Sequence, residues 1–540
     1  MAHTRLLFRS QAREKVLRGA AALADAVRIT LGPKSRCVLI EQKWGAPLVC
    51  NDGVTIAKAI ELEDADEALG ARLLREAAER TGAVVGDGTT TSTILAFSMF
   101  ADGTKNVAAG ATAIDLRRGF ERALPAAVDA LRAQSQPVTT RKEKAQVATI
   151  SAHNDPSIGD LVAEAVERVG REGAITVEET RGTDTTLDVV EGMQFDRGYL
   201  SPYFVTEASR MEAVLADAFI LLTDRRISSV KELVPVLEQV AKSGRGLLIV
   251  AEDIDGEALA TLVLNKLRGV LPCAAVKAPG YGDRRRALLE DIATITGGRV
   301  VAQELGVKFE NVTTAELGQA RRIIIDKDAT TIVGGSGAPS AVGARCDDLR
   351  HQIQATTSTY DREKLEERLA KLSGGVAVIH AGAGSEAEMK SRKEAFEDAI
   401  AATKAAVAEG VVPGGGLALL RCIDAVEAAA SGAGGDERTG MLIVRRALEI
   451  PARQIAENSA LDDGVVVARM RAGSGREGLD AARGAFVDLV DAGIIDPTKV
   501  VRIALENAVS IAGMLLLAEA TLTEVPEPAS ATKGLPVEAV

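Results

Sequence analysis

Apolar residues recur at helical spacing in several long stretches of the chain. Between residues 11 and 30 they return every three or four positions, and Gly32 with Pro33 ends the pattern. Residues 64–84 repeat it, and a further helix is expected from about Thr89. This period marks the buried face of an amphipathic helix. The first third of the chain is therefore predicted to be mainly helical.

Short apolar runs between the helices predict strands. Two are expected in "RCVLI" and "PLVC", and the tripeptide "NDG" at 51–53 is of the kind that makes a tight turn between strands. Further β-prone runs occupy 173–192, and strands alternate with helices over 199–333. Alternation of this kind predicts an α/β unit. Helices return from about residue 360, with one interruption at "SGGVAVIHAGA".

The order helical, mixed, α/β, mixed, helical is nearly symmetric about the middle of the chain. It predicts nested domains, in which the chain leaves the outer domains and re-enters them, with hinges at Gly192 and Gly374-Gly375. The predicted boundaries are 1–136 and 410–524 for a helical domain, 137–191 and 375–409 for a small middle domain, 192–374 for a central α/β domain, and 525–540 for a disordered tail.

Composition narrows the functional classes. A length of 540 residues fits about three domains, and the content of 46% apolar but 3% aromatic residues predicts cores of Ala, Val, Leu and Ile. The net charge of -12 has the wrong sign for a nucleic-acid or anionic-membrane binder. The five cysteines form no CxxC pair, and the amino terminus has no secretory pattern. We expect a soluble, cytoplasmic protein with no nucleic-acid or membrane partner.

The segment "GDGTTT", Gly86 to Thr91, is the strongest candidate for chemistry. Glycines on both sides of Asp87 free the backbone, and three threonines open a predicted helix. The unpaired N–H groups at a helix amino terminus bind phosphate without a lysine. Asp87 would then hold a hard cation such as Mg²⁺, which prefers a carboxylate together with phosphate oxygens. The alternative is a plain turn followed by a capped helix, and the hexapeptide alone does not separate the two.

Other glycine-rich turns and one distant carboxylate add to this candidate. "TLGPK" begins at Thr30, and "VVPGGGLAL" carries Gly415 into a predicted helix. Asp398 lies on the last helix before that second turn, in the segment assigned to the middle domain. Taken alone, Asp398 is better explained as a solvated helical carboxylate than as a functional one.

Eight segments together resemble the signature segments of the bacterial-type (group I) chaperonins, the sixty-kilodalton heat-shock proteins. The resemblance runs from about Arg5 to Leu522, in order and with almost no shift in spacing. The segments are "TLGPK", "NDGVTIAKAIELED", "GDGTTTSTILA", "EGMQFDRGYLSPYF", "VKAPGYGDRRRALLEDIA", "YDREKLEERLAKLSGGVAVI", "EGVVPGGGLAL" and "IIDPTKVVR".

The resemblance implies a fold, a cycle and a set of roles. The helical domain would be the equatorial ATP-binding domain, followed by the intermediate and apical domains. Asp87 would bind Mg²⁺, oxygens around Thr30 and Asn51 with the Thr90 hydroxyl would bind K⁺, and Asp52 and Asp398 would activate water. Hydrolysis would wait until the intermediate domain moves Asp398 over ATP. The implied ATP-binding residues are Thr30, Leu31, Gly32, Pro33, Asn51, Asp87, Gly88, Thr89, Thr90, Thr91, Gly415, Asp480, Ala481, Ile494 and Asp496.

The resemblance also implies partners. Subunits would stack as heptameric rings closed by a small co-chaperonin of the GroES type, and an apolar apical groove would grip unfolded client proteins. Without the resemblance, apolar residues on these helices would be read as core. The implied client-binding residues are Tyr199, Tyr203, Phe204, Val234, Leu237, Leu259, Val263 and Leu264.

Three departures leave rival interpretations open. Ser35 and Asn51 replace a usual glycine and lysine, and the tail lacks the Gly-Met repeats of the family. One rival is an oligomeric binding or scaffold paralogue with weak ATPase activity, which the retention of Asp52, Asp87 and Asp398 argues against. Another is a small-molecule kinase or phosphatase, for which no second polar pocket is evident. A specialised paralogue with few clients is compatible with the altered tail.

Overall fold

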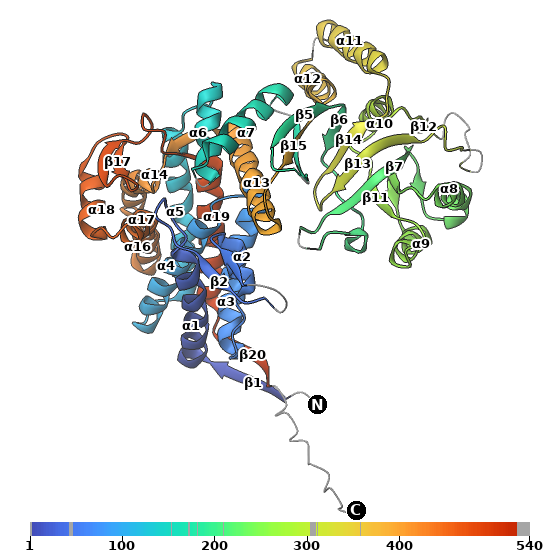
Figure 1. Ribbon diagram of the computed structural model, residues 1–540. Helices are drawn as coiled ribbons and strands as arrows, with labels where there is room; N and C mark the ends of the chain where they lie inside the picture. Colours follow the sequence, from blue (N-terminus) through green and yellow to red (C-terminus); the bar gives the residue numbers. More distant parts are fainter. Residues whose placement is uncertain are drawn as a thin grey trace, which may run out of the picture. The chain divides into compact units, whose positions relative to one another are not determined.

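The computed structural model combines helices and sheets in two compact units (Figure 1). It describes residues 3–42, 47–152, 154–170, 173–180, 182–208, 210–302, 309, 312–356 and 358–525. Unit 1 joins Met1–Ala163 to Glu394–Val540, and unit 2 is Glu164–Lys393. The chain thus leaves unit 1 and returns to it. The division into three domains remains a prediction, and the expected disordered tail beyond residue 525 lies outside the described residues.

Unit 1 is a helical body around one large apolar core. Its central helices α1, α3, α4, α5 and α19 bury Ala, Val, Leu and Ile side chains, as the composition predicts. The helices are α1 (Arg9–Arg28), α2 (Gly53–Ala59), α3 (Ala65–Val85), α4 (Thr89–Ala108), α5 (Ala113–Gln134), α6 (Arg141–Ser151), α7 (Pro156–Val169), α13 (Glu386–Glu409), α14 (Leu417–Arg421), α15 (Ile423–Ala430), α16 (Gly435–Ala447), α17 (Ile450–Asn458), α18 (Asp463–Ala472) and α19 (Thr498–Leu517). Helices α7 and α13 run across the boundary between the units.

The strands of unit 1 form two-stranded antiparallel ribbons. They are β1 (His3–Phe8) with β20 (Ala520–Val525), β2 (Val38–Ile40) with β3 (Leu48–Cys50), β16 (Val411–Pro413) with β19 (Ile495–Pro497), and β17 (Glu477–Asp480) with β18 (Ala485–Asp488). The tripeptide at 51–53 is not a turn between strands, which corrects our expectation. Asp52 instead caps α2, and its carboxylate accepts hydrogen bonds from the N–H groups of Val54 and Thr55. An Asp-Gly pair serves either purpose, so the tripeptide alone does not distinguish a hairpin turn from a helix cap.

Helix α19 is long and apolar enough to cross a membrane by length and composition. It packs against α3, α4 and α5, and its apolar side chains belong to the core of unit 1. The burial of its apolar side chains identifies α19 as a core helix of unit 1.

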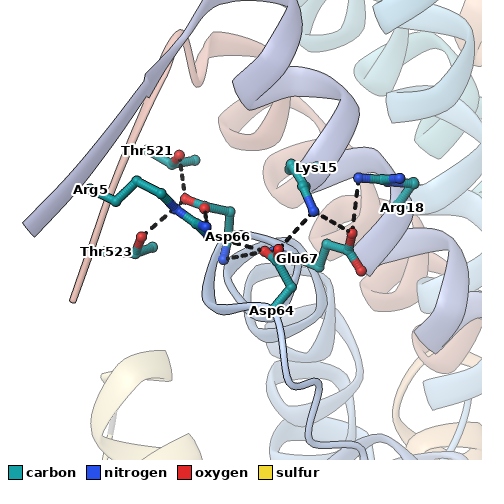
Figure 2. A network of polar contacts seen from close by, with 8 residues as sticks. All are labelled: Arg5, Lys15, Arg18, Asp64, Asp66, Glu67, Thr521 and Thr523. Atoms are coloured by element: carbon teal, nitrogen blue, oxygen red, sulfur yellow. Dashed lines mark hydrogen bonds and ion pairs between the residues drawn. The ribbon is translucent and has the colours of Figure 1, made fainter. Parts of the chain in front are cut away.

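A buried carboxylate ties both ends of the chain to the start of α3 (Figure 2). Asp66 is fully buried and forms an ion pair with Arg5 on β1. The hydroxyls of Thr521 and Thr523 on β20 donate to Asp66 Oδ1 at 2.6 and 3.2 Å. A buried carboxylate is tolerated only when it is paired and hydrogen-bonded in this way. The network therefore holds the β1–β20 ribbon on the helical body.

We expect Asp66→Ala to lower the free energy of unfolding by about 2–3 kcal/mol, because it removes charge-assisted hydrogen bonds and leaves two threonine hydroxyls unpaired. Chemical denaturation followed by circular dichroism measures this. Arg18→Ala is the control, since the Arg18–Glu67 pair at 3.0 Å lies on a more exposed side of the same network and should contribute about 1 kcal/mol or less. Equal losses in both variants would contradict the prediction.

Unit 2 is built on a seven-stranded mixed sheet. Its strand order is β11-β9-β7-β13-β14-β6, with β12 paired to β7. The strands are β6 (Gly192–Phe195), β7 (Ala213–Thr223), β9 (Leu247–Ala251), β11 (Cys273–Lys277), β12 (Val300–Val301), β13 (Gly318–Ile325) and β14 (Thr330–Gly335). Strands β7, β9 and β11 are parallel and almost wholly apolar, as expected for strands covered on both faces.

Unit 2 also contains η1 (Pro202–Phe204), a 3-10 turn, the short parallel strands β8 (Arg226–Ile227) and β10 (Asp253–Ile254), and the helices α8 (Val230–Ser243), α9 (Gly256–Leu267), α10 (Asp283–Thr296), α11 (Pro339–Ala355) and α12 (Thr359–Gly374). Helices α8, α9 and α10 lie beside the strands of the seven-stranded sheet (Figure 1). A second, three-stranded sheet has the order β4-β15-β5 and consists of β4 (Ala174–Glu179), β5 (Thr186–Val190) and β15 (Val376–Ala381). The predicted α/β alternation is present in this unit.

Candidate functional site

A cavity of about 950 Å³ opens in unit 1 where several loops meet. It is lined by every residue that the sequence analysis assigned to ATP, Mg²⁺, K⁺ or water activation. These residues come from several separate parts of the chain and are Thr30, Leu31, Gly32, Pro33, Asn51, Asp52, Asp87, Gly88, Thr89, Thr90, Thr91, Asp398, Gly415, Asp480, Ala481, Ile494 and Asp496. Shared position does not by itself assign their roles.

The glycine loop turns α3 into α4. Gly86 and Gly88 both have positive φ, 71° and 77°, which other residues rarely adopt. A Cβ on Gly88 would lie 2.7 Å from Val500 Cγ1, so the loop also needs glycine for space. The turn directs the amino terminus of α4 and its unpaired N–H groups at the cavity. This geometry suits an anion such as phosphate.

Two further loops close on the same helix end. The hydroxyls of Thr30 and Thr90 lie 3.2 Å apart, and Thr30 Oγ1 donates to the carbonyl oxygen of Val27. A Cβ on Gly53, the first residue of α2, would be 2.6 Å from Thr90 Oγ1. The start of α2 therefore approaches the start of α4 as closely as a glycine allows, and oxygen atoms gather there.

Carboxylates dominate the electrostatics of the cavity. Burial raises the pKa of Asp398 to about 8, and the like charges of Asp87, Asp52 and Glu394 add to the shift. Burial likewise raises the pKa of Asp496 to about 7, with a contribution from Asp87. These groups repel one another, and a bound cation would relieve that repulsion.

The donor set fits a cation that is shared with a phosphate. Within the described residues, no three His, Cys, Asp or Glu side chains lie close enough to hold a metal by themselves. A Mg²⁺ ion keeps few protein ligands and takes its others from phosphate and water, which suits one carboxylate beside a phosphate-binding helix end. Asp87 is the carboxylate beside that helix end. The oxygens around Thr30, Asn51 and Thr90 would suit K⁺.

The opposite end of the cavity is built from turns and short strands. Asp496 lies on β19 opposite Val412 of β16, and a Cβ on Gly414 would lie 3.1 Å from Asp496 Oδ1. Asp480 Oδ1 accepts hydrogen bonds from the N–H groups of Ala482 and Arg483, so one of its oxygens is already engaged. This end offers a carboxylate near a close backbone approach, which suits a sugar hydroxyl.

Sequence reasoning missed one wall of the cavity. Helix α6 contributes Lys142, Gln146, Thr149 and Ser151 to the lining. Its sequence, "RKEKAQVATIS", contains no glycine-rich motif or carboxylate pair. The only local signal is the capping box of Thr140 and Glu143, which marks where the helix starts and says nothing of a site.

Asp398 already lines the cavity in this structure. It lies on α13 and faces the same space as Asp52 and Asp87, within unit 1. The sequence predicts that a domain movement brings Asp398 to the phosphates. A movement of that kind would here adjust a group that is already on the wall.

The predicted client-binding residues lie on η1, α8, α9 and the segment before η1. The side chains of Tyr203, Val234 and Leu264 are 66%, 38% and 45% exposed. Lys266 Nζ donates to the carbonyl oxygen of Val205 at 2.7 Å, which ties α9 to the η1 segment. Tyr199, Leu259 and Val263 are partly buried.

Phe204 and Leu237 differ from the expectation of a surface role. Their side chains are 1% and 8% exposed and belong to the core of unit 2. Leu237 falls on the inward stripe of α8 with Leu233, Val236 and Val240, at the spacing of a helix face packed on a sheet. The exposed apolar surface is therefore carried by the other residues of the set.

The sequence matches known proteins over nearly its whole length. The model of the TCP-1/cpn60 chaperonin family matches residues 23–526. Chaperonin GroEL 5 of Bradyrhizobium diazoefficiens is 65% identical over 528 residues, which cover 98% of each chain. The chain belongs to the TCP-1/cpn60 chaperonin family. Identity at this level over nearly the full length makes it a group I, GroEL-like chaperonin and an ATP-dependent chaperone.

Membership of this family implies several general properties of the protein. This chaperonin binds nucleotide, acts on client proteins and works as an oligomer, in common with its family. The scaffold-paralogue interpretation is not favoured, because a relative this similar is itself named a chaperonin. The mixed helix and sheet architecture agrees with the chaperonin fold.

Proposed function

We propose that this chaperonin hydrolyses ATP in the cavity of unit 1 and uses the cycle to capture and fold client proteins. One observation carries the proposal. The positive end of α4 and three carboxylates, Asp52, Asp87 and Asp398, share a single cavity, although they come from three distant parts of the chain. That combination suits a metal-bound polyphosphate and a water molecule beside it.

The residues have separate tasks in the proposed reaction. The N–H groups of Gly88 to Thr91 bind phosphate oxygens, and Asp87 holds Mg²⁺, which when bound withdraws charge from the phosphates. Oxygens around Thr30 and Asn51, with the Thr90 hydroxyl, hold K⁺. The adenosine is held at the other end by Gly415, Asp480, Ala481, Ile494 and Asp496.

Asp398 and Asp52 act on the attacking water. Asp398 accepts a proton from it, and its raised pKa of about 8 places this carboxyl near the range in which a general base is effective at neutral pH. Asp52 is held in one orientation because its carboxylate caps α2, with Thr55 N–H donating to Oδ2 at 2.7 Å. A fixed carboxylate suits orientation of the water, and the barrier is lowered mainly by positioning and electrostatics.

Two apolar surfaces support the proposal of an assembled machine. The β1–β20 ribbon exposes Leu6, Phe8 and Leu522, and the β2–β3 ribbon exposes Leu39 opposite Val49. Apolar side chains exposed together on a ribbon favour contact with a neighbouring subunit. We propose stacked heptameric rings in the cytoplasm, with equatorial, intermediate and apical domains at the predicted boundaries and a co-chaperonin of the GroES type as the lid.

The proposed client site is the exposed part of the η1–α8–α9 surface. Leu267, the last residue of α9, and Val270 in the turn that follows are 60% and 61% exposed and continue the surface from Leu264. A broad apolar surface with few directional contacts suits clients that share only exposed hydrophobic segments. A small-molecule kinase or phosphatase would need a second polar pocket beside the nucleotide, and nothing in the described part of the chain favours that function. A specialised client range stays compatible with the proposal.

The test is steady-state ATP hydrolysis by the purified protein with Mg²⁺ and K⁺, with and without a bacterial co-chaperonin, together with light scattering for the mass. We expect ring-sized particles whose turnover depends on both cations and changes when the co-chaperonin is added. Monomers with negligible turnover would contradict the proposal. Omission of K⁺ alone separates the two proposed cation sites.

A further inference from the structure

The carboxylate of Asp87 is held by a residue that no motif identifies. Ser151, the last residue of α6, donates from its hydroxyl to Asp87 Oδ2 at 2.8 Å. The two residues are 64 positions apart in the chain, and Ser151 is partly buried in the cavity wall. The contact therefore joins the α6 wall to the glycine loop.

Among the described residues, each oxygen of Asp87 accepts one hydrogen bond. Oδ1 accepts from the N–H group of Gly88, and Oδ2 accepts from Ser151. A carboxylate has about four acceptor positions, so each oxygen keeps a lone pair for a further partner. Two donors on separate oxygens fix the plane of the carboxylate and the direction of those free lone pairs.

The Ser151 contact differs from the usual hydrogen bond of a hydroxyl within a helix. Thr93 and Thr104 on α4 donate to carbonyl oxygens of the preceding turn of their own helix. Ser151 reaches across to another element instead. Its helix is anchored independently, because Val147 packs in an apolar cluster with Val411 and Ile495. The hydrogen bond is therefore not needed to hold α6 in place.

We propose that Ser151 is a positioning residue of the cation site, which orients the Asp87 carboxylate so that it binds a divalent cation together with the phosphates. This inference rests on the proposed function. Residues that donate a hydrogen bond to a metal ligand orient that ligand. Their removal commonly weakens metal binding by about 10- to 100-fold. Loss of the hydroxyl lets the carboxylate rotate, and rotation weakens cation binding without removing any contact to the nucleotide.

The experiment measures the cation directly. Mn²⁺ serves as the paramagnetic probe, ADP as the nucleotide, and electron paramagnetic resonance reports free Mn²⁺ with the full-length protein. We expect Ser151→Ala to weaken Mn²⁺ binding in the presence of ADP by about tenfold or more, and Ser151→Thr, which keeps the hydroxyl, to stay within about twofold of wild type. Binding of ADP in EDTA is expected to be unchanged in both variants.

Ser157→Ala is the matched control. The Ser157 hydroxyl also donates to an aspartate, Asp155 Oδ1 at 2.6 Å, but Ser157 is exposed at the start of α7 and does not line the cavity. We expect wild-type Mn²⁺ binding in this variant.

Three outcomes would overturn the inference, and they are distinguishable. Unchanged Mn²⁺ affinity in Ser151→Ala would remove Ser151 from the cation site. An equal loss of ADP binding in EDTA would assign the hydroxyl a purely structural role. Absence of any Mn²⁺-dependent ADP binding in the wild-type protein would instead reject the proposed function, and the inference with it.

Discussion

Replacing Asp398 with alanine is expected to slow ATP hydrolysis by about 10²- to 10⁴-fold, the usual contribution of a general base. ATP affinity should change little, because the phosphate contacts come from the α4 end and the cation ligands are elsewhere. Single-turnover hydrolysis and equilibrium ATP binding, measured on the same preparation, separate the two quantities. This variant therefore distinguishes chemistry from binding.

The control is the neighbouring residue on the same helix. Glu397→Gln alters one carboxylate of α13 that does not line the cavity, and we expect near-normal turnover. Asp398→Asn keeps the size of the side chain and should be as slow as the alanine variant. Normal turnover in either Asp398 variant would move the proton-accepting role to another group, with Asp52 the next to test.

Solution pH should affect activity and stability in opposite ways through the same carboxyl. Asp398 accepts a proton only when ionised, and its pKa is raised to about 8, so kcat/KM should rise as pH approaches 8. Folding raises this pKa above its ordinary value of 3.8, so the folded state binds the proton more tightly, and stability falls as pH rises between those values. Asp398→Asn should therefore melt at a higher temperature than wild type above about pH 4, and lose the rise in kcat/KM. A lower melting temperature at pH 8 would contradict this.

The nucleotide cavity shows what local sequence can predict. The glycines around Asp87 predict a sharp turn, and the threonines that follow predict the start of a helix. Both predictions are possible because these features depend on backbone preferences within a few residues. The approach of Asp398 to Asp87 depends instead on how α13 packs, since the two lie in distant parts of the chain. Only the family resemblance predicted that pairing.

The misassigned and missed residues have the same physical origin. "NDG" at 51–53 is compatible with a hairpin turn or a helix cap, and the seven-residue helix that follows is too short to dominate the pattern. Ser151 carries no signal, since a serine at a helix end has many partners available. The burial of Leu237 on α8 was likewise not predictable, because the resemblance gives positions without exposure. In each case, tertiary packing determines the local structure, the hydrogen-bond partner or the burial of the side chain.

Replacing Tyr203 and Leu264 together with serine is expected to weaken capture of an unfolded client by at least about 30-fold. Both side chains are largely exposed, at 66% and 45%, on η1 and α9, so they are available to a client and contribute little to the core. Loss of one anchor residue at the centre of a binding surface costs about 2 kcal/mol or more, which is about 30-fold in affinity even if only one of the two side chains acts as an anchor. Co-sedimentation or light scattering with a chemically denatured client measures capture.

Two comparisons make this result interpretable. Tyr360→Ser removes another exposed tyrosine of unit 2. Tyr360 lies on α12, outside η1, α8 and α9, and stacks with Arg284 of α10, so its loss should leave capture intact. Leu237→Ser should lower the stability of unit 2 by about 2–5 kcal/mol, because a hydroxyl replaces a core side chain. Loss of capture in the double variant, with a wild-type melting temperature, would therefore come from the surface itself. Undiminished capture would locate the client site on a different face, because the exposed tyrosine of η1 and one exposed leucine of α9 would then have been removed without effect.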